Sequence, residues 1–90
     1  MVTVKVADFR NKIDHLFRVL NADFHACVNA TELGNWERIA KRVYNELSHL
    51  ECKRANDYDK EQRLKAMEAF EDQMLNSAAR IKRYENEETV

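Results

Sequence analysis

Residues 6–33 read VADFRNKIDHLFRVLNADFHACVNATEL, and their apolar side chains recur at helical spacing. At 100° per residue these side chains lie within about ±60° of one another, which is typical of a long amphipathic helix with one core-facing side. The stripe consists of Val6, Phe9, Ile13, Leu16, Phe17, Leu20, Phe24, Cys27 and Val28. We therefore predict a first helix over residues 6–33, roughly 40 Å long, which ends at Gly34 as its left-handed C-terminal residue.

The composition favours a small all-helical domain. The chain has 90 residues, of which 44% are hydrophobic and 34% are charged, with one glycine and no proline. So few glycines and prolines leave little of the turn and bulge chemistry that a β-rich fold requires. We expect one domain over residues 1–90, without internal repeats.

Two further helices are predicted by the polar residues that flank them. Asn35 is a plausible N-cap for a second helix over residues 36–55. Asp59 and Gln62 have the spacing of a capping box at the start of a third helix over residues 60–84. Because the links are short, consecutive helices should be antiparallel neighbours. The sequence thus predicts an all-α, up-down-up three-helix bundle with a long first helix.

Each of these helices has an expected core-facing side. In the second helix it comprises Trp36, Ile39, Ala40, Val43, Leu47 and Leu50. In the third helix it comprises Leu64, Met67, Phe70, Met74, Ala78 and Ile81. Residues 85–90 are predicted to form a loose acidic tail.

The N-terminal residues have a different periodicity. Val2, Val4 and Val6 alternate with Thr3 and Lys5, which is the period of a β-strand. No other stretch of the chain alternates in this way. The segment 1–5 is therefore either a strand that pairs with the same segment of a second chain or a frayed, weakly helical lead-in.

The second half of the first predicted helix has an additional apolar seam on its opposite side. Small residues four positions apart allow a neighbouring backbone to approach closely, so this seam faces either another helix of the same chain or a second copy. We expect a homodimer through this seam, and we leave open whether the helix is continuous or bent near Asn21. The seam consists of Val19, Ala22, Ala26, Ala30 and Leu33.

The outer side of the second predicted helix is basic and is the best candidate for a partner surface. Its residues are Arg38, Lys41, Arg42, Asn45, His49 and Lys53. They could follow a phosphate backbone, an acidic protein surface or the third helix of a second copy. Against nucleic acid, the net charge is −1 and the third helix carries Glu61, Glu68, Glu71 and Asp72.

Catalytic and metal-binding chemistry has little support. Glu46 and His49 have the Glu-x-x-His spacing of carboxylate-bridged di-iron sites, but the motif occurs once. His49 and Cys52 could supply two of the four ligands of a zinc site, but the sequence offers no two further ligands at a suitable spacing. Cys27 is expected to be a core residue and Cys52 an exposed thiol. We expect no cofactor, no metal and no enzymatic activity.

The function expected from the sequence is a non-catalytic protein–protein interaction module with a regulatory, adaptor or inhibitor role. The alternative is a DNA- or RNA-binding regulator that uses the basic outer side of the second helix. Met1–Arg10 lacks the apolar run of a signal peptide, and no stretch is long and apolar enough for a membrane span. We therefore expect a cytoplasmic protein that does not contact membranes.

Overall fold

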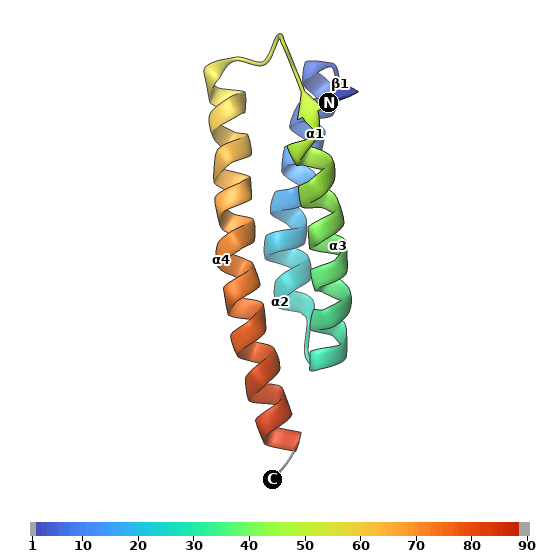
Figure 1. Cartoon of the computed structure of the whole chain (residues 1–90), viewed down its shortest axis with the longest axis vertical. Coiled ribbons are helices and arrows are strands. Elements are labelled where there is room, and N and C mark those ends of the chain that lie inside the picture. Colours follow the sequence, from blue (N-terminus) through green and yellow to red (C-terminus); the bar gives the residue numbers. More distant parts are fainter. Residues whose placement is uncertain (1, 89–90) are drawn as a thin grey trace.

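Three helical rods lie side by side, and each runs antiparallel to the one before it (Figure 1). The computed structural model describes residues 2–88. The rods form an elongated bundle of about 55 × 19 × 18 Å, and the prediction of an all-α three-helix arrangement is confirmed. The elements are β1 (Val2–Thr3), α1 (Val6–Arg18), the π-helix η1 (Val19–Asp23), α2 (Phe24–Ala26), α3 (Ala30–Ser48), β2 (Leu50–Glu51) and α4 (Asp57–Glu88).

The predicted end of the first helix is wrong, because the rod ends at Ala26 and α3 already begins at Ala30. Asn29 is the N-cap of α3, and its side chain accepts a hydrogen bond of 2.8 Å from the backbone N–H of Glu32. The Glu32 carboxylate in turn accepts one of 2.8 Å from the Val28 N–H. These reciprocal bonds form a capping arrangement that starts a helix. Asn35 is therefore not an N-cap, and it lies within α3.

The first rod is not a uniform α-helix. A π-helical turn, η1, separates α1 from α2 at the position where the sequence left the course of the helix open. Two of its carbonyls accept side-chain hydrogen bonds from the neighbouring rods: Trp36 Nε1 donates to Val19 O at 2.6 Å, and Gln73 Nε2 donates to Leu20 O at 2.8 Å. Wide π turns leave backbone groups available for such partners, so η1 is tied to both α3 and α4.

The N-terminal segment pairs within its own chain. Val2 lies opposite Leu50 and Thr3 opposite Glu51 in a parallel two-stranded ladder, with the Val4 N–H donating to Glu51 O at 2.9 Å. The expected N-terminal strand is confirmed, but its expected partner, the same segment of a second chain, is wrong, and so is the alternative of a frayed lead-in. The pairing strand exists because α3 ends at Ser48, and the predicted extension of this helix to residue 55 is therefore also wrong.

The core lies along the axis between the rods and contains most of the predicted stripe of the first helix. Val28, however, is 69% exposed, and so are Ile39 (47%) and Leu64 (59%), which were expected to face inward. The buried apolar residues are Phe9, Ile13, Leu16, Val19, Leu20, Phe24, Cys27, Leu33, Trp36, Ala40, Val43, Leu47, Cys52, Ala55, Ala66 and Phe70. The first rod and α3 thus supply most of the core.

Helix α4 faces the core with a partly polar row that keeps part of the predicted apolar stripe, since Phe70 is buried and Met74 and Ile81 pack against the core. Only Ala66 and Phe70 are buried apolar residues in this helix, and the buried polar side chains of Asp59 and Ser77 occupy the same side. The predicted inward residue Ala78 is exposed. The helix also continues to Glu88, so residues 85–88 of the predicted tail are helical, while residues 89–90 lie outside the described range.

The start of α4 is fixed by an ion pair with α1. Arg10 donates to both carboxylate oxygens of Asp59, from Nε at 2.8 Å and from Nη2 at 3.1 Å. The hydrogen bonds from Arg10, helped by one from the Asn56 N–H, lower the pKa of Asp59 below its usual value. Asp59 N–H donates to the Asn56 side chain at 2.8 Å. The capping box is therefore formed by Asn56 and Asp59, and the predicted pair of Asp59 with Gln62 is wrong.

The position of Gly34 inside α3 gives a direct test of these boundaries. No glycine of the described chain has positive φ, and a Cβ added at Gly34 would meet no atom within 4 Å. Glycine destabilises a helix interior relative to alanine, so Gly34→Ala is expected to raise the free energy of unfolding by about 0.5–1 kcal/mol. Urea denaturation followed by circular dichroism measures this change. A loss of stability would instead indicate the left-handed helix end that the sequence suggested.

Candidate interaction surface

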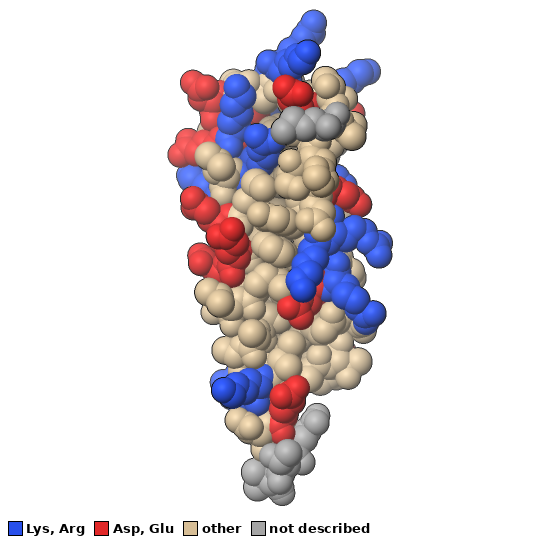
Figure 2. Space-filling model, viewed as in Figure 1, with Lys and Arg blue, Asp and Glu red and all other residues tan. Residues whose placement is uncertain are grey.

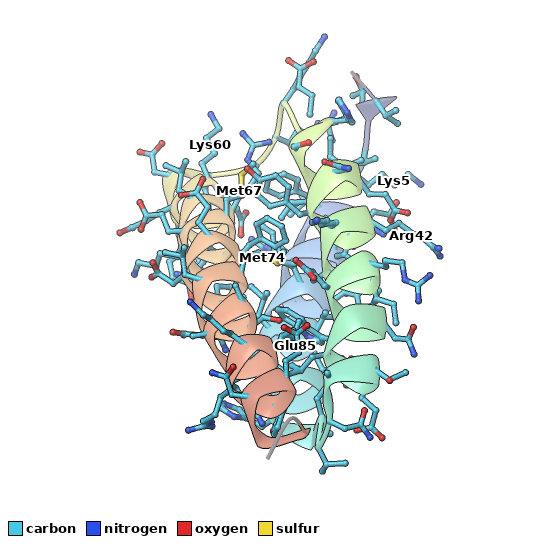
Figure 3. The ribbon with its side chains drawn as sticks, turned by 60° about the horizontal axis from the view of Figure 1, so that its bottom comes forward. Lys5, Arg42, Lys60, Met67, Met74 and Glu85 are labelled. Atoms are coloured by element: carbon cyan, nitrogen blue, oxygen red, sulfur yellow. The ribbon has the colours of Figure 1, made fainter. Side chains whose placement is uncertain are left out.

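The basic residues predicted on the second helix lie on the outer side of α3. We call Arg38, Lys41 and Arg42 the basic row; all three side chains are exposed (Figure 2). Lys41 has only a long contact with Glu37, at 3.8 Å, and Arg38 donates to the side-chain oxygen of Asn35. Arg42 makes no direct ion pair with any described side chain and extends into solvent (Figure 3). The row therefore has unneutralised positive charge.

The remaining residues of the predicted basic side are divided between elements. Asn45 is exposed in the same helix as the basic row, and His49 is the C-cap residue of α3. Lys53 lies beyond β2, where it lines a hollow together with residues 3–6. The structure thus keeps four of the six predicted residues within one helix, and it places His49 and Lys53 toward the end of the bundle that holds the small sheet.

Exposed carboxylates follow the outer side of α4. We call Glu61, Glu68, Glu71 and Asp72 the acidic row; within the described chain, its one ion pair joins Glu61 to Lys65 at 3.8 Å. Leu64 and Leu75 lie in the same helix at 59% and 72% exposure. Figure 2 shows the acidic side chains over α4 along one edge of the molecule and basic ones over α3 along the other edge.

Between the two rows lies a strip of mainly uncharged side chains, with Lys and Arg side chains at its upper end in Figure 2. It contains partly buried side chains that pack against the core, among them Tyr44 of α3 and Met74 and Ile81 of α4. Tyr44 stacks on Phe70 with ring centroids 4.2 Å apart. Figure 3 shows Met67 and Met74 on the side of α4 that is turned toward α3. The face formed by α3 and α4 therefore has basic, uncharged and acidic bands in that order.

The five residues predicted for self-association do not form one surface. Val19 and Leu33 are 1% and 0% exposed and belong to the core of the single chain. Ala22 and Ala26 are exposed on the first rod, whereas Ala30 is half-buried at the start of α3. The continuous seam required an unbroken helix over residues 6–33. Because the chain turns after Ala26, the seam is split between two rods.

The groups considered for metal or catalytic chemistry have structural partners. Glu46 accepts a 2.6 Å hydrogen bond from Lys12, which lowers the pKa of this carboxylate. Cys52 is buried, so the expectation of an exposed thiol is wrong. Cys27 is buried as predicted, and burial raises the pKa of its thiol. Among the side chains described in residues 2–86, no three His, Cys, Asp or Glu are grouped so as to hold a metal ion.

Two further findings bear on the class of protein. None of the helices described between residues 2 and 88 has the length and apolar character needed to cross a bilayer. Comparisons with protein-family models, curated proteins and solved structures find no match to this chain. The class is therefore defined by the fold and its surface alone: a small three-helix bundle with a charge-segregated face.

Proposed function

We propose that the protein is a non-catalytic helical interaction module with a regulatory or adaptor role, and that it docks through the face formed by α3 and α4. The observation that carries the proposal is the separation of charge on this face. The basic row is exposed on α3 and the acidic row is exposed on α4. Among the described side chains, one member of each row has an ion pair, Lys41 with Glu37 and Glu61 with Lys65, both at 3.8 Å. The first partner we propose is a second copy of the chain.

Symmetry explains why a second copy fits this face. A two-fold axis parallel to the long axis of the bundle places α4 of one copy over α3 of the other, and the reverse. In this arrangement each acidic row meets a basic row, and the uncharged strip around Met67 and Met74 meets its own copy (Figures 2 and 3). Such an isologous interface is the commonest form of closed oligomer. The exposed side chains of Leu64 and Leu75 add apolar area beside the acidic row.

The expected association depends on salt. An exposed ion pair contributes about 0.2–1 kcal/mol, so several pairs acting together are needed for a measurable effect. Raising the salt concentration from about 0.05 M to about 0.5 M shortens the screening length and should weaken the dimer. Sedimentation equilibrium over a range of protein concentrations measures this dependence against the chain mass of 10.7 kDa.

Charge reversal identifies the face. Lys41→Glu with Arg42→Glu places like charges opposite each other in the proposed dimer, and so does Glu68→Lys with Glu71→Lys. We expect either pair to weaken association about tenfold or more. The matched control is Lys5→Glu with Arg18→Glu, which reverses two exposed charges on α1 or at its start.

Two results would reject the proposal. A wild-type chain that stays monomeric at low salt over the whole concentration range would remove the second copy as the partner. A wild-type dimer that the control pair weakens as much as the Lys41 and Arg42 reversal would place the interface elsewhere. Circular dichroism of each variant confirms that the helical content is retained, so that a change in mass reports association.

The exposed basic row also favours a second candidate, a DNA- or RNA-binding regulator. Arg38, Lys41 and Arg42 lie within about one turn of the exposed side of α3, which is the arrangement of a helix that contacts phosphates. The acidic row on the adjacent helix opposes such binding. Gel-shift titration with duplex DNA and with RNA at low salt distinguishes the candidates. Binding that disappears in Lys41→Glu with Arg42→Glu supports this one, and an absence of binding eliminates it.

A further inference from the structure

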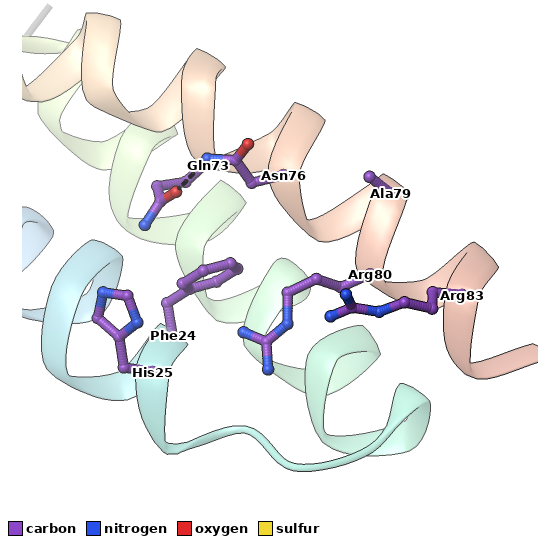
Figure 4. A pocket seen from close by; sticks show the side chains of 7 residues that line it. All are labelled: Phe24, His25, Gln73, Asn76, Ala79, Arg80 and Arg83. Carbon is purple, nitrogen blue, oxygen red and sulfur yellow. Dashed lines mark hydrogen bonds between the residues drawn. The ribbon is translucent and has the colours of Figure 1, made fainter. Parts of the chain in front are cut away.

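A pocket of about 590 Å³ lies between α2 and α4 (Figure 4). Its lining includes Phe24 and His25 from α2 and Gln73, Asn76, Arg80 and Arg83 from α4. The pocket thus has two guanidinium groups and an imidazole in its wall, and none of the residues that line it has a carboxylate. Figure 4 shows both arginine side chains extending from α4 toward the segment that contains Phe24 and His25.

Arg80 is held in place by contacts on several sides. Its Nη2 donates to the carbonyl of Cys27 at 3.2 Å and to the hydroxyl of Tyr84 at 2.9 Å. The guanidinium also lies over the Phe24 ring, 5.1 Å from its centroid, and 5.8 Å from the centroid of Tyr84. These bonds use Nη2 alone, so the Nε and Nη1 hydrogens make no bond to a described residue. A fixed guanidinium with free donors is suited to an oxygen anion.

The polar side of the pocket is also ordered. Gln73 donates to Leu20 O at 2.8 Å and accepts a bond of 2.8 Å from Asn76 Nδ2. These amides fix the wall between Phe24 and Arg80. Arg83, one turn beyond Ala79, is exposed and makes no ion pair or hydrogen bond with any side chain described in residues 2–86. In Figure 4 both guanidinium groups lie on the side of α4 that faces α2, and none of the residues that line the pocket carries a negative charge.

We infer that this pocket binds a phosphate-type oxyanion, either free phosphate or the phosphate of a small phosphorylated molecule. Two nearby guanidinium groups repel each other. An anion between them is attracted to both, and this attraction offsets the repulsion. Arginine forms paired hydrogen bonds to phosphate oxygens, and the imidazole of His25 adds a ring N–H from the opposite wall. The volume of the pocket exceeds that of the anion itself, which leaves space for a small organic group.

Isothermal titration calorimetry with inorganic phosphate tests the inference at fixed ionic strength, with chloride as the reference anion. Arg83→Gln removes a charge from an exposed position, so the fold should be unaffected and phosphate should bind about tenfold or more weakly. The matched control is Lys82→Gln, which removes the same charge from the next residue. Lys82 is exposed and does not line the pocket, and this variant should bind phosphate as the wild type does.

Adenosine monophosphate and glycerol phosphate, titrated in the same way, distinguish the two sources of the anion. Tighter binding of either ester than of inorganic phosphate supports a small phosphorylated ligand, and equal or weaker binding supports free phosphate. Phosphate that binds no more tightly than chloride, or a loss of affinity that is the same in Arg83→Gln and Lys82→Gln, would overturn the inference. Chemical shifts of the backbone amides around Arg80 locate the bound anion independently.

Discussion

Trp36→Ala is expected to lower the free energy of unfolding by about 3–5 kcal/mol, the usual cost of deleting a large buried aromatic side chain. Trp36 is 3% exposed and packs edge-on against Phe24, with ring centroids 4.9 Å apart. Its indole N–H also donates to the Val19 carbonyl at 2.6 Å, which joins α3 to the π-helical turn. The substitution removes both the packing and one of the two donors to this carbonyl, which also accepts from the Phe24 N–H. Urea denaturation followed by circular dichroism measures the loss.

A second substitution at the same position separates the two contributions. Trp36→Phe keeps an aromatic ring but removes the N–H donor. The Val19 carbonyl still accepts from the Phe24 N–H, so we expect a smaller loss of about 0.5–1.5 kcal/mol from the deleted hydrogen bond. Ile39→Ala is the control within the same helix, because Ile39 is 47% exposed and should contribute less. If Trp36→Ala costs no more than Ile39→Ala, then the contact between α3 and η1 is not a part of the core.

Phe70→Ala is the second substitution for which we expect a large effect, again about 3–5 kcal/mol. Phe70 is 9% exposed and stacks on Tyr44, with ring centroids 4.2 Å apart. Among the described side chains of α4 only Ala66 and Phe70 are buried apolar residues, and Phe70 is the larger of the two, while Met74 and Ile81 pack against the core in part. Loss of the Phe70 ring should therefore loosen α4 more than the rest of the bundle.

Hydrogen exchange measured by residue distinguishes this local effect from a general loss of stability. Faster exchange in α4 than in α1 and α3 is the expected result for Phe70→Ala. Leu75→Ala, at a residue of the same helix that is 72% exposed, is the control and should change little. Uniform acceleration over all three helices would mean that α4 unfolds together with the rest, contrary to this expectation.

The sequence predicted the core correctly where apolar residues recur at the helical period. Phe9, Ile13 and Leu16 follow the helical period and are buried, as predicted. The prediction misses the break between the first rod and α3 because it places the end of the first helix at Gly34. The actual signal is the pair Asn29 and Glu32, whose spacing is that of a capping motif. A polar residue followed three positions later by Glu was therefore a better guide to the boundary than the only glycine.

Other features depend on contacts that no local pattern encodes. The partner of the N-terminal strand is only two residues long, so Leu50–Glu51 has no detectable alternation. In α4, the polar side chains of Asp59 and Gln73 face the other rods because they have partners there, Arg10 and the Leu20 carbonyl. A stripe predicted from apolar residues alone consequently places Leu64 and Ala78 inward, whereas both are exposed.

The candidate sites were predictable to different degrees. The basic row could be located from the spacing of Arg38, Lys41 and Arg42, and all three side chains are exposed on one helix. The seam predicted for self-association failed at Val19 and Leu33, because it assumed an unbroken helix. The pocket proposed for an oxyanion combines residues of α2 with residues of α4 that lie 48 to 59 positions later in the chain, and only the packing of α4 beside α2 brings them together.

The central claim is that two copies associate with the basic row of each opposite the acidic row of the other. The most direct test is the mass of an equimolar mixture of two variants, Lys41→Glu with Arg42→Glu and Glu68→Lys with Glu71→Lys. Each variant alone should sediment as a monomer, and the mixture should restore a species of twice the 10.7 kDa chain mass at low salt. A mixture that remains monomeric while the wild type dimerises would contradict the claim.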